Sequence, residues 1–101
     1  MEFLEKELSE HRLLLVELTQ EGCGPCQAIR QKLSSWQKEH PRTACLYLPI
    51  EEHRALCSQL GIYTGPALLL FAEGKLTLRQ AGCFSLNEVL RKAEQYESLL
   101  F

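Results

Sequence analysis

Short apolar runs constrain the fold of this chain more than any other feature of its sequence. Residues 13–18 (LLLVEL) are apolar on both faces, which is typical of a central strand of a parallel sheet covered by helices. Residues 44–48 and 67–72 predict a second and a third strand, the second one buried. A tight Glu-Gly turn at 73–74 joins the third strand to a fourth at 75–81, whose alternating residues predict one wet face.

In the segments outside these runs, apolar residues recur at helical spacing. The expected helices cover residues about 2–11, 24–39, 52–60 and 85–98. Gly61 caps the third helix, and Ser85 with Glu88 forms a capping box that begins the last one. The order αβαβαββα predicts an α/β fold, with parallel strands across the two helical crossovers and an antiparallel last pair.

Length and composition limit the number of domains and the classes of protein to which this chain can belong. With 101 residues, 46% of them hydrophobic and 24% charged, we expect one globular domain over residues 1–101. The balance of 11 Lys+Arg against 13 Asp+Glu gives no support for nucleic-acid binding. We expect no membrane segment, because no apolar run approaches the roughly 20 residues that a spanning helix needs. Charged residues throughout positions 2–12 argue against an export signal, so we expect a cytoplasmic protein.

The cysteines are the unusual part of the composition. The chain has five of them, an odd number and too few for a disulfide-built scaffold. In a reducing cytosol, a cysteine pair is more often catalytic or metal-binding than structural. Cys45, in an apolar strand, and Cys57, on the inner side of a short helix, are expected to be small core residues.

The CGPC segment at 23–26 lies between the first strand and the long helix. Cys23 falls at the helix N-terminus, where free N–H groups and the helix dipole favour a nucleophilic thiolate. Cys26 lies about one turn further on the same side, so the two sulfur atoms can form a disulfide. Gly24 and Pro25 form the first turn, where the missing proline N–H costs nothing. The segment therefore predicts thiol–disulfide exchange, with Cys23 as nucleophile and Cys26 as resolving cysteine.

A zinc site is the alternative for this pair. Zinc needs four ligands, and the sequence has neither a second CxxC nor a His-x3-His pattern. We therefore expect no metal. There is no nicotinamide or flavin motif either, so we expect no bound cofactor.

With these landmarks in this order, nearly the whole chain resembles the thioredoxin family. The shared landmarks are CGPC at 23–26, GIYTGPALLLF at 61–71, the Glu-Gly-Lys turn at 73–75, and Gly82. The resemblance implies a thioredoxin-like fold with a cis-proline at Pro66 facing the cysteine pair. It also implies a substrate groove bordered by Gly22 and Gly82, in which the backbone of Gly65 hydrogen-bonds a bound chain.

The sequence departs from the family near this site. Gly22 stands where an aromatic residue is usual, and Glu21 precedes it. Glu17 matches the family's buried acid; we expect burial to raise its pKa and suit it to act as general base for Cys26. Tyr47 replaces the family's buried lysine, so Glu17 is expected to lack a cationic neighbour. The segment before Cys23 is short, which implies a shortened N-terminal helix and a missing or shortened outermost strand.

These features predict a protein-disulfide reductase. Its expected partners are protein disulfides and a reductase or other dithiol donor. Two alternatives remain: a binding or adaptor module with one dedicated protein partner, motivated by Gly22, Glu21 and Tyr47, and a redox sensor that uses Cys83 as a secondary thiol. We expect a monomer, although the edge left by a missing strand offers a route to a dimer.

Overall fold

The computed structural model describes residues 2–101, and their elements follow the expected order within one or two residues. In chain order these are η1 (Glu2–Leu4), α1 (Glu5–Glu10), β1 (Leu13–Thr19), α2 (Gly24–Glu39), β2 (Ala44–Pro49), η2 (Ile50–Glu52), α3 (Arg54–Leu60), β3 (Ala67–Ala72), β4 (Lys75–Ala81) and α4 (Leu86–Leu100). The first expected helix begins as a 3₁₀ turn, η1. Gly61 has the left-handed conformation expected of a helix cap, with φ of 69°, and the Ser85 side chain accepts a hydrogen bond from the Glu88 N–H.

The four strands form one mixed sheet in the order β2-β1-β3-β4, which confirms the predicted fold class. β1 is parallel to β2 and antiparallel to β3, and β3 pairs with β4 as an antiparallel hairpin. The expectation that the second crossover also joins parallel strands is wrong. α3 has seven residues, about 10 Å of helix, so it is too short to carry the chain back along a strand of about 20 Å. The chain therefore enters β3 from the edge at which β2 ends.

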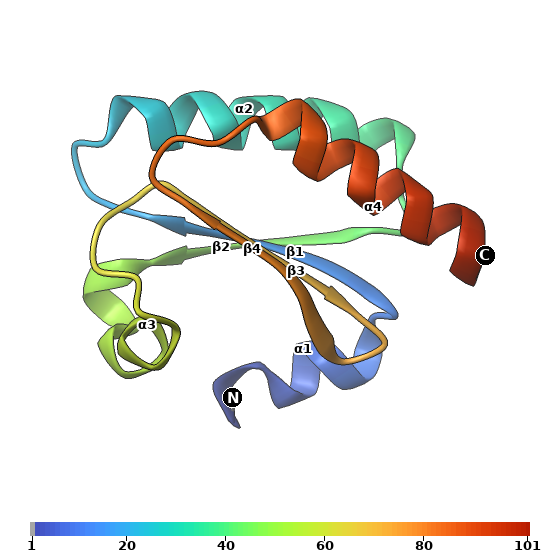
Figure 1. The fold of residues 1–101 in the computed structure, drawn as a ribbon, viewed down its shortest axis with the longest axis horizontal. Coiled ribbons are helices and arrows are strands. Elements are labelled where there is room, and N and C mark those ends of the chain that lie inside the picture. Colours follow the sequence, from blue (N-terminus) through green and yellow to red (C-terminus); the bar gives the residue numbers. More distant parts are fainter. Residues whose placement is uncertain (1) are drawn as a thin grey trace.

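Helices cover both faces of this sheet (Figure 1). α2 and α4 lie over one face, and α1 and α3 lie over the other. β1 supplies both cores, because alternate side chains of a strand point to opposite faces. Leu13 and Leu15 pack with Leu33 of α2 and Val89 of α4 in one cluster. The even-numbered residues of β1 pack with α3 in the other cluster. None of the helices in residues 2–101 is long and apolar enough to cross a membrane.

β2 is an edge strand, and the prediction that it is buried is largely wrong. Leu48 is buried, but all the other residues of β2, Cys45 among them, are half-buried. The cause is its position: β1 is its only neighbour in the sheet formed by the described residues. Its apolar composition reflects the helix layers above and below it rather than a central place. Cys57, in contrast, is 1% exposed, which confirms it as a core residue.

Candidate active site

One edge of the sheet gathers three loops that are far apart in the sequence. The strand register aligns Leu18 of β1 with Ala67 of β3, and Ala67 with Ala81 of β4. The segment after β1, the segment before β3 and the segment after β4 therefore leave the sheet at the same edge, and Figure 1 shows them at the end where α2 begins. This convergence brings the CGPC segment beside the proline loop.

Cys23 and Cys26 form a disulfide at the start of α2, with their Cα atoms 5.3 Å apart. Cys23 is the N-cap residue, and its Sγ accepts a hydrogen bond of 3.1 Å from the Cys26 N–H. A donor and the positive end of the helix dipole at this sulfur stabilise a thiolate once the disulfide is reduced. Cys23 is half-buried, whereas Cys26 is 2% exposed. A molecule arriving from solvent therefore meets Cys23 first.

The proline loop packs directly against the pair. The Gly65–Pro66 peptide bond is cis. A Cβ atom placed on Gly65 would lie 3.0 Å from the Cys26 Sγ and 3.3 Å from the Leu18 carbonyl oxygen. Such contacts are too tight for most side chains, so the loop approaches the sulfur this closely because residue 65 is glycine.

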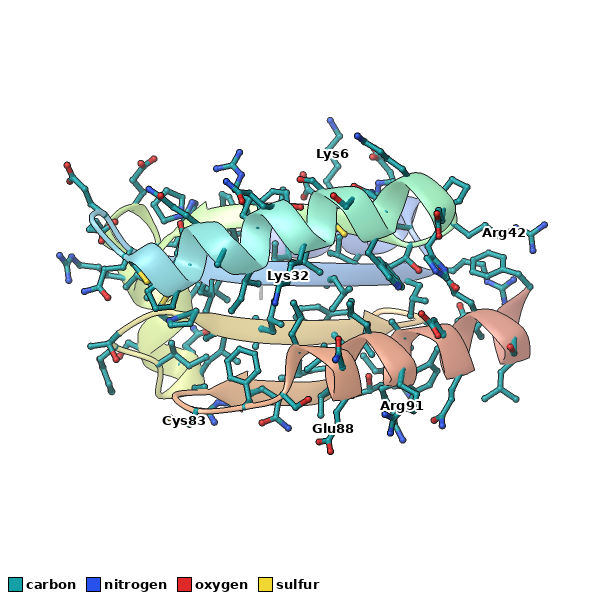
Figure 2. The ribbon with its side chains drawn as sticks, turned by 90° about the horizontal axis from the view of Figure 1, so that it is seen from above. Lys6, Lys32, Arg42, Cys83, Glu88 and Arg91 are labelled. Carbon is teal, nitrogen blue, oxygen red and sulfur yellow. A yellow bond between two sulfur atoms is a disulfide. The ribbon has the colours of Figure 1, made fainter. Side chains whose placement is uncertain are left out.

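The other residues expected at the groove lie around the same edge. Gly22 has φ of 73° and is exposed, and the space where its side chain would stand is open. Gly82, with φ of 79°, directly follows β4. Cys83 is exposed in the loop that leads into α4, at the end of the molecule where α2 begins (Figure 2). Gly22 therefore places no side chain in the open space next to Cys23.

Glu17 lies in the middle of β1, on the face covered by α2, and is 0% exposed. Neither carboxylate oxygen has a hydrogen-bond partner among the described residues. Burial raises the pKa of Glu17 from 4.5 to about 7, while the positive charge of Arg30 opposes this rise. A carboxyl group with this pKa accepts and releases a proton near neutral pH.

The expectation that Glu17 lacks a cationic neighbour is wrong. Tyr47 is the cross-strand partner of Glu17, and the Arg30 guanidinium lies 4.7 Å from the centre of the Tyr47 ring. Arg30 follows Cys26 by four residues and therefore shares its side of α2. The spacing from Cys26 places Arg30 on this side of the helix, but only the packing of α2 on β1 and β2 brings its charge near Glu17. The positive charge comes from the helix rather than from the strand.

A recess of about 370 Å³ opens beside Cys26. Its α2 side includes Cys26, Gln27 and Arg30, and its rim carries exposed Glu51 and Glu52. Arg30 forms no ion pair with these carboxylates or with any other described residue. Its charge therefore acts on the interior of the site through space.

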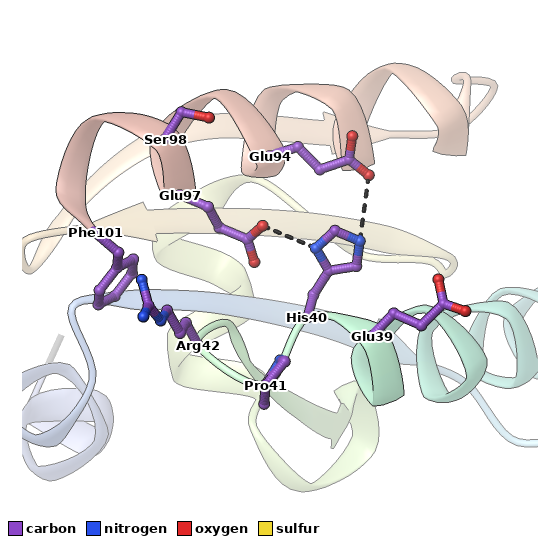
Figure 3. A pocket seen from close by; sticks show the side chains of 8 residues that line it. All are labelled: Glu39, His40, Pro41, Arg42, Glu94, Glu97, Ser98 and Phe101. Atoms are coloured by element: carbon purple, nitrogen blue, oxygen red, sulfur yellow. Dashed lines mark hydrogen bonds and ion pairs between the residues drawn. The ribbon is translucent and has the colours of Figure 1, made fainter.

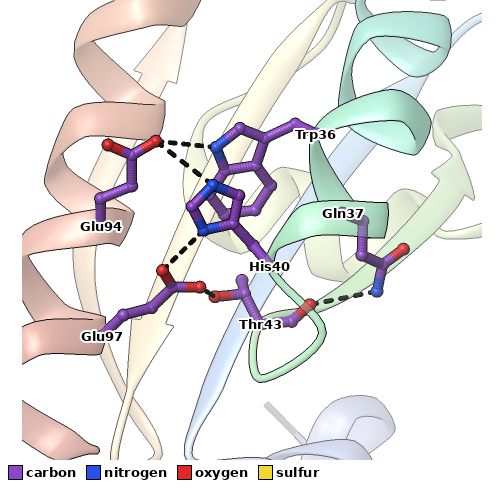
Figure 4. A network of polar contacts seen from close by, with 6 residues as sticks. All are labelled: Trp36, Gln37, His40, Thr43, Glu94 and Glu97. Atoms are coloured by element: carbon purple, nitrogen blue, oxygen red, sulfur yellow. Dashed lines mark hydrogen bonds and ion pairs between the residues drawn. The ribbon is translucent and has the colours of Figure 1, made fainter.

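A second polar cluster lies at the opposite end of α2, about 20 Å from the cysteines along the helix. The His40 Nδ1 forms a 2.8 Å hydrogen bond with the Glu97 carboxylate, and the His40 ring stacks on Trp36, whose indole N–H donates to Glu94 (Figure 4). These residues adjoin a hollow of about 640 Å³ between α4 and the loop after α2 (Figure 3). His40 is half-buried, and its contact with Glu97 links the end of α2 to α4.

Nothing in either region resembles a metal centre. The part of the chain that the structure describes contains no cluster of three or more histidine, cysteine or acidic side chains placed to hold a metal ion.

Comparison with known proteins gives consistent results. The family model described as Thioredoxin matches residues 1–95. A thioredoxin of Chlamydia caviae is 30% identical over 84 residues, which cover 83% of this chain and 82% of that protein. A thioredoxin of Chlamydia muridarum is 28% identical over 85 residues, 84% of this chain and 83% of that protein. A mutant thioredoxin from Halobacterium salinarum has a structure with a TM-score of 0.82 at 25% identity, over 95% of this chain and 84% of its own.

Proposed function

Because this chain belongs to the thioredoxin family, we propose that it is a protein-disulfide reductase in which Cys23 and Cys26 cycle between dithiol and disulfide. The observation that carries this proposal is the pairing of an accessible N-cap sulfur with a buried partner. The accessible sulfur reaches a client, and the buried one is protected from solvent until the client is bound.

In the first half of the cycle, the Cys23 thiolate attacks one sulfur of a client disulfide. A Cys23–client bond forms, the client S–S bond breaks, and the departing client sulfur leaves as a thiolate that takes up a proton. The Cys26 N–H, which donates to the Cys23 Sγ, supports the thiolate before the attack. Exposed Gly24 and Pro25 leave the approach to Cys23 open.

In the second half, Cys26 loses its proton and attacks the Cys23 Sγ. The mixed disulfide breaks, the second client sulfur leaves with a proton, and the Cys23–Cys26 disulfide forms; two electrons have passed to the client. We assign the role of proton acceptor to Glu17, whose pKa of about 7 suits it to take a proton from a thiol and to release it again. A second dithiol then reduces the pair and restores the starting state.

Members of this family act on protein disulfides and depend on a reductase. We propose that the electron donor is a separate dithiol protein and that this chain itself needs no cofactor. Cys45, Cys57 and Cys83 are free thiols, a state that a reducing compartment such as the cytoplasm maintains. We also propose that the protein works as a monomer, which light scattering at high protein concentration tests.

The deciding experiment is the reduction of insulin disulfides with dithiothreitol as electron source. We expect the wild-type protein to accelerate turbidity well above dithiothreitol alone, and Cys23→Ser to abolish the acceleration. Cys26→Ser is expected to accumulate mixed disulfides with clients, because the resolving step is removed. If the wild type is no faster than dithiothreitol alone and Cys26→Ser captures one protein only, the adaptor hypothesis replaces the reductase.

Cys83 supports a second candidate role, that of a redox-sensing thiol. It is exposed in the loop after Gly82, whereas Cys57 is buried and Cys45 is half-buried with its pKa raised by burial to about 11. Under mild hydrogen peroxide, a sensor accumulates a sulfenic acid or a disulfide at Cys83 before the other free cysteines. Mass spectrometry that finds Cys83 reduced throughout removes this role.

A further inference from the structure

We propose that Gln20 is a specificity-determining residue. Its side-chain carbonyl accepts the hydrogen bond of the Gly65 backbone N–H, beside the redox disulfide, until a client chain displaces it. The inference rests on the proposed reductase function and deepens it. It concerns which chains gain access to the pair rather than the chemistry of exchange.

The contact is direct. The Gly65 N–H donates to the Gln20 Oε1 at 3.1 Å. Residue 66 is proline and has no N–H, so Gly65 carries the last backbone donor before β3 begins. Because Gly65 also lies against the Cys26 Sγ, this donor is immediately beside the reacting sulfur atoms. Gln20 therefore takes the hydrogen bond of a backbone donor that lies at the centre of the site.

A client chain has reason to use the same N–H. Its sulfur has to reach Cys23, so the residues around that sulfur pass along the segment before β3. Extended chains commonly bind next to a strand through backbone hydrogen bonds, in which a carbonyl of the client accepts an N–H of the protein. The Gly65 N–H faces such a carbonyl only after the Gln20 amide has moved away.

The Gln20 side chain is free to move away from the Gly65 N–H. It is exposed, in the turn after β1, where its backbone carbonyl accepts a 3.2 Å hydrogen bond from the Cys23 N–H. That hydrogen bond fixes the backbone, whereas the side chain retains several rotatable bonds. A client that forms a good hydrogen bond to Gly65 displaces the amide, and a client that cannot do so gains nothing from displacing it. The contact thus favours clients with an extended backbone next to their disulfide.

The test compares Gln20→Met with the wild type in the reduction of a peptide disulfide at varied peptide concentration. Methionine has a similar length but cannot serve as a comparable acceptor. Because an exposed hydrogen bond contributes little, we expect Gln20→Met to lower KM by about threefold to tenfold and to leave kcat unchanged. Gln31→Met, at an exposed position on α2, is the matched control and is expected to keep the wild-type KM. An unchanged KM, or a lower kcat/KM, in Gln20→Met overturns the proposal.

A second measurement needs no client. Hydrogen exchange at the Gly65 amide, followed by NMR in the oxidised protein, is expected to be faster in Gln20→Met than in the wild type. Equal exchange rates mean that the contact does not exist in solution and overturn the proposal even if the wild type reduces insulin. If the wild type fails to reduce insulin, the reductase function fails, while the exchange experiment still reports on the contact itself.

Discussion

A glutamate lies near each end of α2, and the two differ in their hydrogen bonding. At the end far from the cysteines, the Glu97 carboxylate accepts a hydrogen bond from the Thr43 hydroxyl and pairs with His40, so both of its oxygens have a partner. At the end with the cysteines, Glu17 is fully buried and has no hydrogen-bond partner among the described residues. Buried polar groups are normally satisfied, and exceptions need a reason. The difference separates a carboxylate that links the end of α2 to α4 from a buried carboxyl group whose pKa is raised.

The first prediction concerns the free energy that the protein loses when the buried Glu17 carboxyl group ionises. Its pKa of about 7 in the folded state exceeds the ordinary value of 4.5, so the folded protein binds the proton more tightly than the unfolded chain does. The free energy of unfolding therefore decreases as pH rises through this window, by about 3 kcal/mol in total. Glu17→Gln cannot ionise, and we expect it to be more stable than the wild type by about this amount at pH 8.

Urea unfolding of the oxidised proteins at pH 5 and pH 8 measures the effect. We expect the advantage of Glu17→Gln to be small at pH 5, where Glu17 is largely protonated, and large at pH 8. An equal difference at the two pH values contradicts the assignment of a raised pKa. The same variant is expected to resolve the mixed disulfide more slowly, because Cys26 loses its proton acceptor.

Local patterns in the sequence predicted much of this end of the molecule. The apolar run of β1, the helix start at Cys23 and the glycine before Pro66 are each encoded within a few residues. The cation next to Glu17 was missed because Arg30 reaches the site through the fold, over the ring of Tyr47. The direction of β3 was also missed, since it depends on the length of α3 and not on the pattern of the strand itself.

The second prediction makes the same substitution at the other end. Glu97→Gln loses the charge that strengthens its hydrogen bonds with His40 and Thr43, so we expect a loss of about 1–3 kcal/mol in the free energy of unfolding. The sign is opposite to that expected for Glu17→Gln. Because Thr43 shares this hydrogen bond, the losses in Glu97→Gln and Thr43→Val are expected not to add in a double-mutant cycle. Additive losses, or a stabilised Glu97→Gln, remove the contrast between the two ends.

No pattern in the sequence predicts this second polar cluster. Its members are contributed by α2, the following loop and α4, and Thr43 is separated from Glu97 by 54 residues. Each residue alone resembles an ordinary polar surface residue. Only the packing of α4 beside α2 brings the side chains together (Figure 4). Contacts of this kind depend on tertiary structure and leave no periodic signal.

The third prediction, with the smallest expected effect, concerns Arg30, whose charge reduces the free energy lost when Glu17 ionises. Its positive charge opposes the rise in the pKa of Glu17, so Arg30→Gln should raise that pKa above about 7. Because Arg30 is exposed and solvent screens its charge, we expect Arg30→Gln to lose less than about 1 kcal/mol of stability at pH 8 and nothing comparable at pH 5.

The expected effect on Glu17 depends on a positive charge at this position rather than on the shape of arginine. Arg30→Lys should therefore restore most of the wild-type pH dependence, both in urea unfolding and in the resolving step. Lys32→Gln removes a charge from an exposed site on the same helix and should leave the pH dependence unchanged. In the background of Glu17→Gln, the substitution Arg30→Gln should no longer alter the pH dependence, because the group on which it acts cannot ionise. A shift that persists in that double variant means that Arg30 acts on another group and contradicts its expected effect on Glu17.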